Sequence, residues 1–516
     1  MKKYLYLIAG LFLWASCVVA VNNKSGLSGS TSANNKKAEA KRQKAPKYVF
    51  YFIGDGYGPA QAHLAEEYLA NRDGRILPDT LLMNTFPVHG TYTTYAGNRF
   101  ITGSAAAGTA LAAGHKTTIN TICMSGDHGL KYKSMAELLR SRGMKIGIVT
   151  SVSIDHATPA VFYAHQPNRN NYYDIALELA ESDFNYFAGG GFKDPEGVKK
   201  GNKNPLANMG IDKSTATSAN KYPSAYAIAE QAGYRFVNSK SEFAQLKKGD
   251  DKIVVFDPKP ASGASIPYVI DQTDENFTLV DFTKKGIELL DNPNGFFMMV
   301  EGGKIDWACH ANDAATAALE VLQFDDAVRE AYNFYLKHPN ETLIVICSDH
   351  ETGGLTLGHA ATHYETSYQY LNNQKCSTEA FTEMIEDYKA KHPNNARYED
   401  IYPLLKEYFG FDTTDELKLD QYDIADLKKA LQDDVTTTYE ERMHNPRLEC
   451  GYGPYNPLAT VAARILANKA GLSWTTYSHT AIPCPARAVG VGAEAFYGYY
   501  DNTELPRKIL KMYELL

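Results

Sequence analysis

The chain has 516 residues, of which 44% are hydrophobic, and its formal net charge is −8 at pH 7. The length corresponds to about three ordinary domains, and the apolar fraction is sufficient for a globular core. The charge is spread along the chain without a basic stripe, so we expect no nucleic-acid partner, and any affinity for anions must come from a local site.

The first twenty residues have the pattern of an export signal. Two lysines precede an apolar run over residues 4–20, which is short for a membrane span and is not followed by a stop-transfer sequence. Cleavage after residue 20 would give a soluble product, whereas the lipobox-like sequence before Cys17 would leave a lipid anchor there. Trp14 replaces the usual lipobox leucine and favours the soluble product. We expect an exported protein, in the periplasm or on the cell surface, without a transmembrane helix.

Residues 21–46 follow the signal and are rich in Asn, Ser, Lys and Ala without apolar periodicity. This composition is typical of a flexible spacer. The remaining residues, 47–516, are expected to form the folded domain.

Short, fully apolar runs recur in this domain and predict strands that are buried on both faces, as in a helix-covered parallel sheet. Helical stretches alternate with the runs, which predicts an α/β fold with a central, mostly parallel sheet between two helical layers. The expected strands are residues 48–53, 146–149, 253–256, 296–300, 343–346 and 488–492, and the expected helices are residues 104–113, 134–142 and 311–336.

Residues 359–470 break this alternation. They are rich in Tyr, Asn, Asp and Lys and have some helical periodicity. We interpret them as a large insertion on the edge of the sheet.

Potential ligand residues follow three of the predicted strands. Asp55 follows the first strand, Glu301 follows the fourth, and Asp349 and His350 follow the fifth. Open α/β sheets bind their ligands beyond the carboxyl ends of the strands, so these side chains are candidates for one shared site.

Asp306 and His310 are four residues apart, so on a helix both would point to one side and could bind one cation. Mixed His and Asp ligands suit zinc, whereas oxygen ligands alone suit magnesium. An isolated pair of this kind would more often be a solvated helix face. The prediction of a metal site therefore depends on the whole set occurring at successive strand ends.

Ser104 begins a helix of small residues and has two possible roles. A serine at this position commonly caps the helix. The same position also suits a nucleophile, because the helix N-terminus stabilises an anion and a metal ion can activate the hydroxyl. No Gly-x-Ser-x-Gly sequence surrounds Ser104, which argues against an esterase triad.

Taken together and in chain order, these residues resemble the alkaline phosphatase family from about residue 48 to about residue 502. The resemblance is highly specific because it is collective. The motifs that carry it are Gly54-Asp55-Gly56, Ser104-Ala105-Ala106-Ala107-Gly108-Thr109-Ala110, His156-Ala157-Thr158-Pro159-Ala160, Arg169, Glu301-Gly302-Gly303, Asp306 with His310, Ser348-Asp349-His350, and His479-Thr480.

The resemblance implies an enzyme that hydrolyses small phosphate monoesters through a phosphoserine intermediate. Ser104 would be the nucleophile, and Arg169 would bind two phosphate oxygens through its planar guanidinium group. Two zinc ions and one magnesium ion would be the cofactors. The implied ligands are Asp306, His310 and His479 for the first zinc, Asp55, Asp349 and His350 for the second, and Asp55, Thr158 and Glu301 for the magnesium.

The chain departs from the family pattern at three places. Gly103 stands where an aspartate often positions the arginine, which predicts a looser Arg169 and weaker inhibition by phosphate. His156 and Trp307 flank the third metal site, a pairing that resembles the cold-active marine-bacterial branch and favours magnesium over a third zinc. The lead-in to His479 is Tyr-Ser rather than Gly-Gly, so His479 is the least secure ligand.

Rival functions are a phosphodiesterase or sulfatase of the same superfamily, and a non-catalytic phosphate- or metal-binding surface protein. Thr158, Glu301 and Arg169 favour monoesters, and the sequence after Ser104 lacks the Pro and Arg of a sulfatase motif. A binding protein would have no need of the serine. A homodimer is possible because family members are often dimers, although the sequence has no interface signature.

Several other polar residues near the motifs have less specific interpretations. His165 and His359 are more typical of supporting or surface groups than of ligands. Asp155 and Glu351 adjoin site residues and are expected to orient them by hydrogen bonds. Lys304 could support a bound phosphate, but it is more typical of a solvated lysine.

Overall fold

The computed structural model describes residues 45–75, 80–197, 223–392 and 396–516. The expected signal peptide, the candidate lipidation site at Cys17 and nearly all of the expected spacer lie outside the described residues. No helix within the described ranges is long and apolar enough to cross a membrane.

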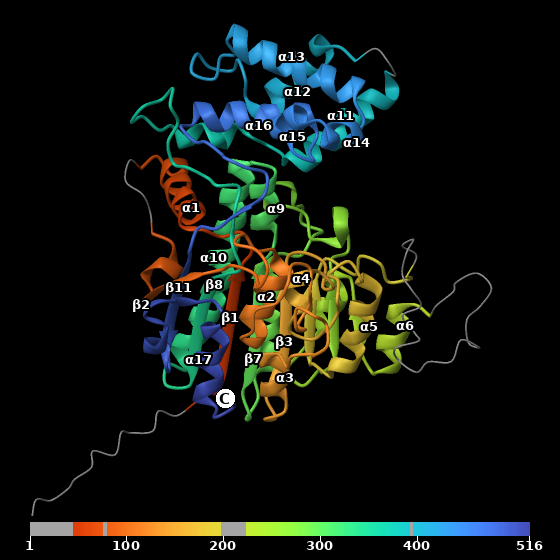
Figure 1. Ribbon diagram of the computed structural model, residues 1–516, viewed down its shortest axis with the longest axis vertical. Helices are drawn as coiled ribbons and strands as arrows, with labels where there is room; N and C mark the ends of the chain where they lie inside the picture. The colour runs from red at the N-terminus through yellow and green to blue at the C-terminus, as the bar shows by residue number, and fades with distance from the viewer. Residues whose placement is uncertain (1–44, 76–79, 198–222, 393–395) are drawn as a thin grey trace, which may run out of the picture. The chain divides into compact units, whose positions relative to one another are not determined.

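A ten-stranded sheet forms the centre of the fold (Figure 1). Its strand order is β12-β2-β11-β8-β1-β7-β3-β4-β6-β5, and only β11 runs against its neighbours, so the sheet is mostly parallel as expected. The strands are β1 (Tyr48–Gly54), β2 (Val88–Thr93), β3 (Lys145–Thr150), β4 (Tyr186–Gly189), β5 (Arg235–Val237), β6 (Ile253–Phe256), β7 (Phe296–Gly302), β8 (Thr342–Ser348), β11 (Cys484–Gly490) and β12 (Gly498–Asp501).

Helices cover both faces of the sheet, and strand β1 shows why its apolar run is continuous. Its side chains alternate between two buried cores, with Tyr51 in one and Phe50 and Phe52 in the other. The first core includes residues of α2 (Ser104–Ala113), α3 (Met135–Arg140), α4 (Ala157–Ala160), α5 (Tyr172–Ser182), α6 (Ala225–Gln231) and α17 (Glu504–Met512), and the second includes residues of α1 (Pro59–Arg72), α8 (Leu279–Leu290), α9 (Lys304–His310) and α10 (Ala314–Lys337). This arrangement confirms the predicted three-layer α/β sandwich.

Between β9 (Glu351–Thr352) and β10 (His479–Thr480) the chain forms a group of helices with its own apolar core. This core includes residues of α1 and α10 but, among the described residues, none from a strand. The sequence suggested an insertion on the edge of the sheet. In the structure the insertion packs on helices α1 and α10 instead. Its helices are η6 (Tyr368–Asn373), α11 (Thr378–Lys391), α12 (Tyr398–Phe409), α13 (Gln421–Thr436), α14 (Tyr439–His444), α15 (Pro446–Tyr452) and α16 (Pro457–Lys469).

Two aspartates, the buried Asp313 and the half-buried Asp271, attach the start of α11 to the sheet domain. Asp313, the N-cap of α10, accepts a hydrogen bond from the backbone N–H of Thr378 at 2.9 Å. Asp271 accepts one from the backbone N–H of Ser377, also at 2.9 Å. The first turn of α11 is consequently held in a defined position relative to the end of α9 and the start of α10.

The six described cysteines are all free thiols. Five are buried, including Cys347 in β8, and Cys450 is exposed. The structure therefore provides no disulfide among the described residues.

Candidate active site

The register of three central strands brings the expected ligands to one edge of the sheet. Gly54 at the end of β1 is paired with Gly302 of β7 on one side and with Ser348 of β8 on the other. Asp55 and Asp349 each directly follow one of these positions, and Glu301 lies one residue before Gly302. All three carboxylates are fully buried.

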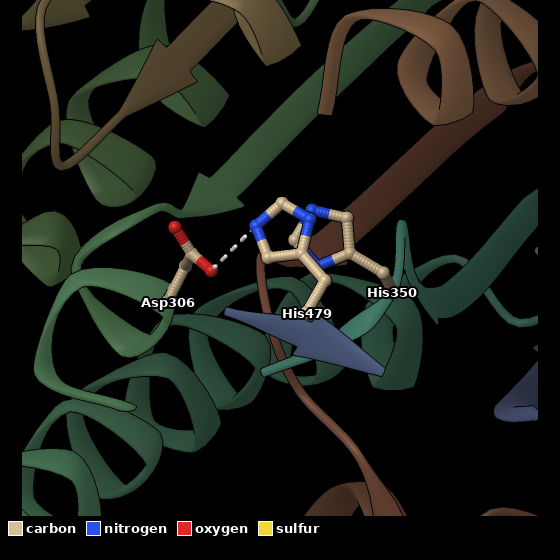
Figure 2. Close-up of side chains that lie close together, drawn as sticks. All are labelled: Asp306, His350 and His479. Carbon is tan, nitrogen blue, oxygen red and sulfur yellow. Dashed lines mark ion pairs between the residues drawn. The ribbon is translucent and has the colours of Figure 1, made fainter. Parts of the chain in front are cut away.

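Three groups of side chains place potential metal-ligand atoms within 4.8 Å of one another. All of the predicted ligands belong to these groups or contact them directly. The groups are Asp306, His350 and His479 (Figure 2), then Asp55, Asp349 and His350, and finally Asp55, His156 and Glu301.

The first group is built on helix α9 and on the short β9–β10 pair. Asp306 and His310 lie one turn apart, with His310 Nε2 3.3 Å from Asp306 Oδ1. The antiparallel pairing places His479 opposite Thr352, whose hydroxyl donates a hydrogen bond to Asp306. Figure 2 shows the His479 ring beside that of His350, and their centroids are 3.5 Å apart. The predicted His479 is thus close to its expected partners.

The hydrogen bonds of His310 and His479 orient both rings for metal binding. Each Nδ1 lies near a backbone carbonyl oxygen, that of Tyr477 at 2.7 Å and that of Thr102 at 2.8 Å, and must donate to it. With the proton on Nδ1, each Nε2 has a free lone pair. The two Nε2 atoms are only 3.1 Å apart, an arrangement that a cation between them would stabilise.

Two buried carboxylates also leave oxygen atoms without a hydrogen bond. Asp55 Oδ1 and Glu301 Oε1 are both in this state. An unpaired carboxylate oxygen in the protein interior costs several kcal/mol, roughly, unless a positive charge compensates it. The donor set and these oxygens therefore fit bound cations.

Burial and the neighbouring charges also shift the pKa values of the carboxylates at the site. Burial, followed by the nearby Asp349 carboxylate, raises the pKa of Asp55 well above its usual value. Burial raises the pKa of Glu301 as well. At Asp306, burial is the largest single effect and opposes ionisation, but the hydrogen bond and charge of His310 together with the charges of His479 and His350 outweigh it and lower the pKa. Bound cations would favour the ionised form of all three carboxylates.

Ser104 is the first residue of α2, but it is not the helix cap. Gly103 is the N-cap residue, and no side chain forms a capping hydrogen bond. The Ser104 hydroxyl instead lies 3.3 Å from His350 Nε2, next to the second group of ligands. The capping role is therefore wrong, and the hydroxyl is free for chemistry at the N-terminus of a ten-residue helix.

Arg169 has a partner that the sequence did not predict. Its Nη2 lies 2.9 Å from His156 Nε2, and because a guanidinium group only donates, His156 must accept there. Burial, followed by the Arg169 charge, holds the pKa of His156 well below its usual value, so the ring is neutral. The Trp307 ring meets it edge-on, with centroids 5.7 Å apart.

A cavity of about 350 Å³ opens over these groups. Ser104, Arg169, Asp306, His310 and His479 all line it. The cavity therefore joins the expected nucleophile, the expected anion-binding arginine and the first ligand group in one space.

Some candidate residues lie elsewhere or have other roles. His165 lies between the carboxylates of Glu137 and Glu178. His359 accepts a hydrogen bond at Nδ1 from the backbone N–H of Ala361 in the same loop. Glu351 accepts hydrogen bonds from Gln61 and from Thr480, the residue that follows His479.

Sequence reasoning missed several residues around the site. Thr352 and Thr150 hold the carboxylates of Asp306 and Glu301, but an isolated threonine carries no signal of such a role. Lys304 is fully buried rather than solvated. Glu379 and Tyr455 reach the cavity from the insertion, whose packing the sequence did not reveal.

Comparisons with known proteins agree with this geometry. A family model described as alkaline phosphatase matches residues 46–515. Alkaline phosphatase 3 of Bacillus subtilis is 28% identical over 501 residues, covering 96% of each chain. Alkaline phosphatase 4 of the same bacterium is 28% identical over 505 residues, covering 96% of this chain and 95% of the relative. The structure of a cold-active alkaline phosphatase from Shewanella sp. has a TM-score of 0.70 and 26% identity, covering 91% of this chain and all of that one.

Replacing His479 with alanine tests the first ligand group. We expect His479→Ala to lose about one bound metal equivalent per chain, because one of the three nitrogen and oxygen ligands is removed. Metal content would be measured by plasma mass spectrometry after gel filtration. His444→Ala, which changes an exposed histidine of the insertion, serves as the matched control. Full retention of metal by His479→Ala would exclude this residue as a ligand.

Proposed function

We propose roles for the individual site residues on the premise that the chain belongs to the alkaline phosphatase family and is a metal-dependent enzyme that hydrolyses phosphate monoesters. The observation that carries the proposal is the Ser104 hydroxyl, which is free of any capping bond and lies 3.3 Å from His350 Nε2. A hydroxyl beside a cluster of ligand side chains is suited to attack phosphorus, whereas a binding protein has no use for it.

Ser104 would carry the phosphoryl group during the reaction. The bond between Ser104 Oγ and phosphorus forms as the bond between phosphorus and the alcohol oxygen breaks, and the alcohol leaves with a proton. Water then attacks the phosphoserine, which releases inorganic phosphate and restores the serine. Arg169 would donate to two phosphate oxygens and hold the group in line for both steps.

The donor sets support two zinc ions, one bound by Asp306, His310 and His479 and the other by Asp55, Asp349 and His350. Nitrogen and carboxylate ligands in this combination suit zinc. When bound, the cations supply positive charge that stabilises the developing oxyanions and favours the serine alkoxide.

The Arg169–His156 hydrogen bond supports magnesium at the third site. His156 uses the lone pair of Nε2 for Arg169, so its proton is on Nδ1 and neither nitrogen is free to bind a cation. The remaining ligands are oxygen atoms of Asp55, Thr158 and Glu301, and the Thr158 hydroxyl already lies 3.4 Å from Asp55 Oδ2. An oxygen-only set is what magnesium prefers.

We also propose that the protein is exported and acts in the periplasm or at the cell surface, because its first twenty residues have the pattern of an export signal. Residues 1–20 would be the signal peptide, residues 21–46 a spacer, and residues 47–516 the catalytic domain with its insertion. Lipidation at Cys17 and homodimer formation stay predictions of the sequence.

The first test of these roles is Ser104→Ala with p-nitrophenyl phosphate as substrate. We expect kcat to fall by on the order of a thousandfold or more, because the nucleophile is lost. Metal content is expected to stay at the wild-type value, since the other ligands of each cation remain. Ser141→Ala, at an exposed position, provides the control. A variant that keeps its metals and most of its turnover would refute the phosphoserine route.

A second test concerns the arginine. A side chain at position 103 would enter open space, since its Cβ would meet only Ile119, at 4.0 Å. Gly103→Asp should therefore fold, add a carboxylate partner for Arg169, and strengthen competitive inhibition by inorganic phosphate severalfold. Gly103→Asn adds the same volume without the charge and should change less. An unchanged inhibition constant in Gly103→Asp would show that Arg169 is already fully positioned by His156.

A further inference from the structure

The insertion contributes a carboxylate to the wall of the active-site cavity. Glu379, in the first turn of α11, lines the same cavity as Ser104 and Arg169. Its side chain is 29% exposed, whereas the carboxylates of the ligand groups are almost fully buried. Glu379 is thus an acidic group that a molecule in the cavity can reach.

The position of Glu379 is fixed by its neighbours. Ser377 and Thr378, the two residues before it, donate their backbone N–H groups to Asp271 and Asp313 of the sheet domain. Because the start of the helix is attached at these points, the backbone that carries Glu379 is already ordered, and binding of a ligand has only to order the side chain.

The buried cation beside Glu379 is shared with other carboxylates. Lys304 Nζ lies 3.6 Å from Glu379 Oε2 and is fully buried. The carboxylates of Glu379, Glu320 and Asp271 all act on this one ammonium group. Because Lys304 also interacts with Glu320 and Asp271, it is not paired with Glu379 alone, and the partly exposed Glu379 can still form an ion pair with a cation in the cavity.

Aromatic rings beside Glu379 are also suited to a cation. Trp307 and Tyr455 line the cavity and are half-buried. The Lys304 ammonium already lies 3.5 Å from the centroid of the Tyr268 ring and 4.7 Å from that of Trp307. Rings near a carboxylate bind ammonium groups well, by combining cation–π attraction with an ion pair.

We propose that Glu379, Trp307 and Tyr455 form a subsite for the leaving group and favour phosphate monoesters of alcohols that carry an ammonium group. The inference rests on the proposed function, in which Ser104 attacks phosphorus and the alcohol oxygen departs. Ser104, Arg169 and Glu379 line one cavity, so the alcohol of a bound phosphate monoester occupies a space that Glu379 also faces.

The test compares two probes of nearly equal size, 2-aminoethyl phosphate and 2-hydroxyethyl phosphate. The ratio of their kcat/KM values is measured for wild type and for Glu379→Gln, which keeps the shape but removes the charge. We expect the ratio to fall by roughly fivefold in the variant, the effect of one ion pair at a partly exposed position. Glu383→Gln, an exposed position on the same helix, should leave the ratio unchanged.

A second measurement needs no variant. The wild-type preference for the amino substrate should decline as the salt concentration rises, because the attraction is between charges that solvent reaches. An equal loss on both probes in Glu379→Gln, or a ratio that is insensitive to both the substitution and salt, would overturn the subsite. Failure of the wild type to hydrolyse either probe or p-nitrophenyl phosphate would instead overturn the proposed function.

Discussion

The site depends on one constraint, which is that carboxylates at the ends of three parallel strands are buried without enough positive charge from the protein. Asp55 and Glu301 each leave an oxygen without a hydrogen bond, and their pKa values are raised mainly by burial. Bound cations resolve this constraint, because they compensate the buried charge and turn a destabilising cluster into a site that stabilises an oxyanion. Two further groups lie next to this cluster of carboxylates. Ser104 lies beside it, and Arg169 faces the same cavity.

The fold provides this arrangement through strand register and through segments that are distant in sequence. Strands β1, β7 and β8 end together, which aligns three of the ligand-bearing positions. His479 arrives from beyond the insertion and is positioned by the β9–β10 pair. The insertion is in turn attached to the sheet domain through Asp271 and Asp313, so it can form one wall of the cavity while its own core remains separate.

Much of the fold was predictable because a doubly covered sheet produces uninterrupted apolar runs. All six predicted strands are present. The missed strands lack such a run, as in β2, where buried and exposed side chains alternate, or are very short, as in β5. The side chains that gather at the site were predictable as a set through the family resemblance, although His310 and His479 gain their orientation from backbone carbonyls that no sequence pattern reveals. The contact of Lys304 with Glu379 depends on packing between distant segments, and a single sequence does not specify which segments meet. The Arg169–His156 hydrogen bond joins residues only 13 apart, but it depends on the path of the loop between them.

Anomalous X-ray diffraction at the zinc absorption edge, from crystals of the purified protein, tests the central claim most directly. The account predicts two zinc peaks, one among Asp306, His310 and His479 and the other among Asp55, Asp349 and His350. It also predicts no zinc peak beside Thr158 and Glu301. Absence of metal from both histidine-containing groups in an active preparation would contradict the claim that cations compensate the buried carboxylates.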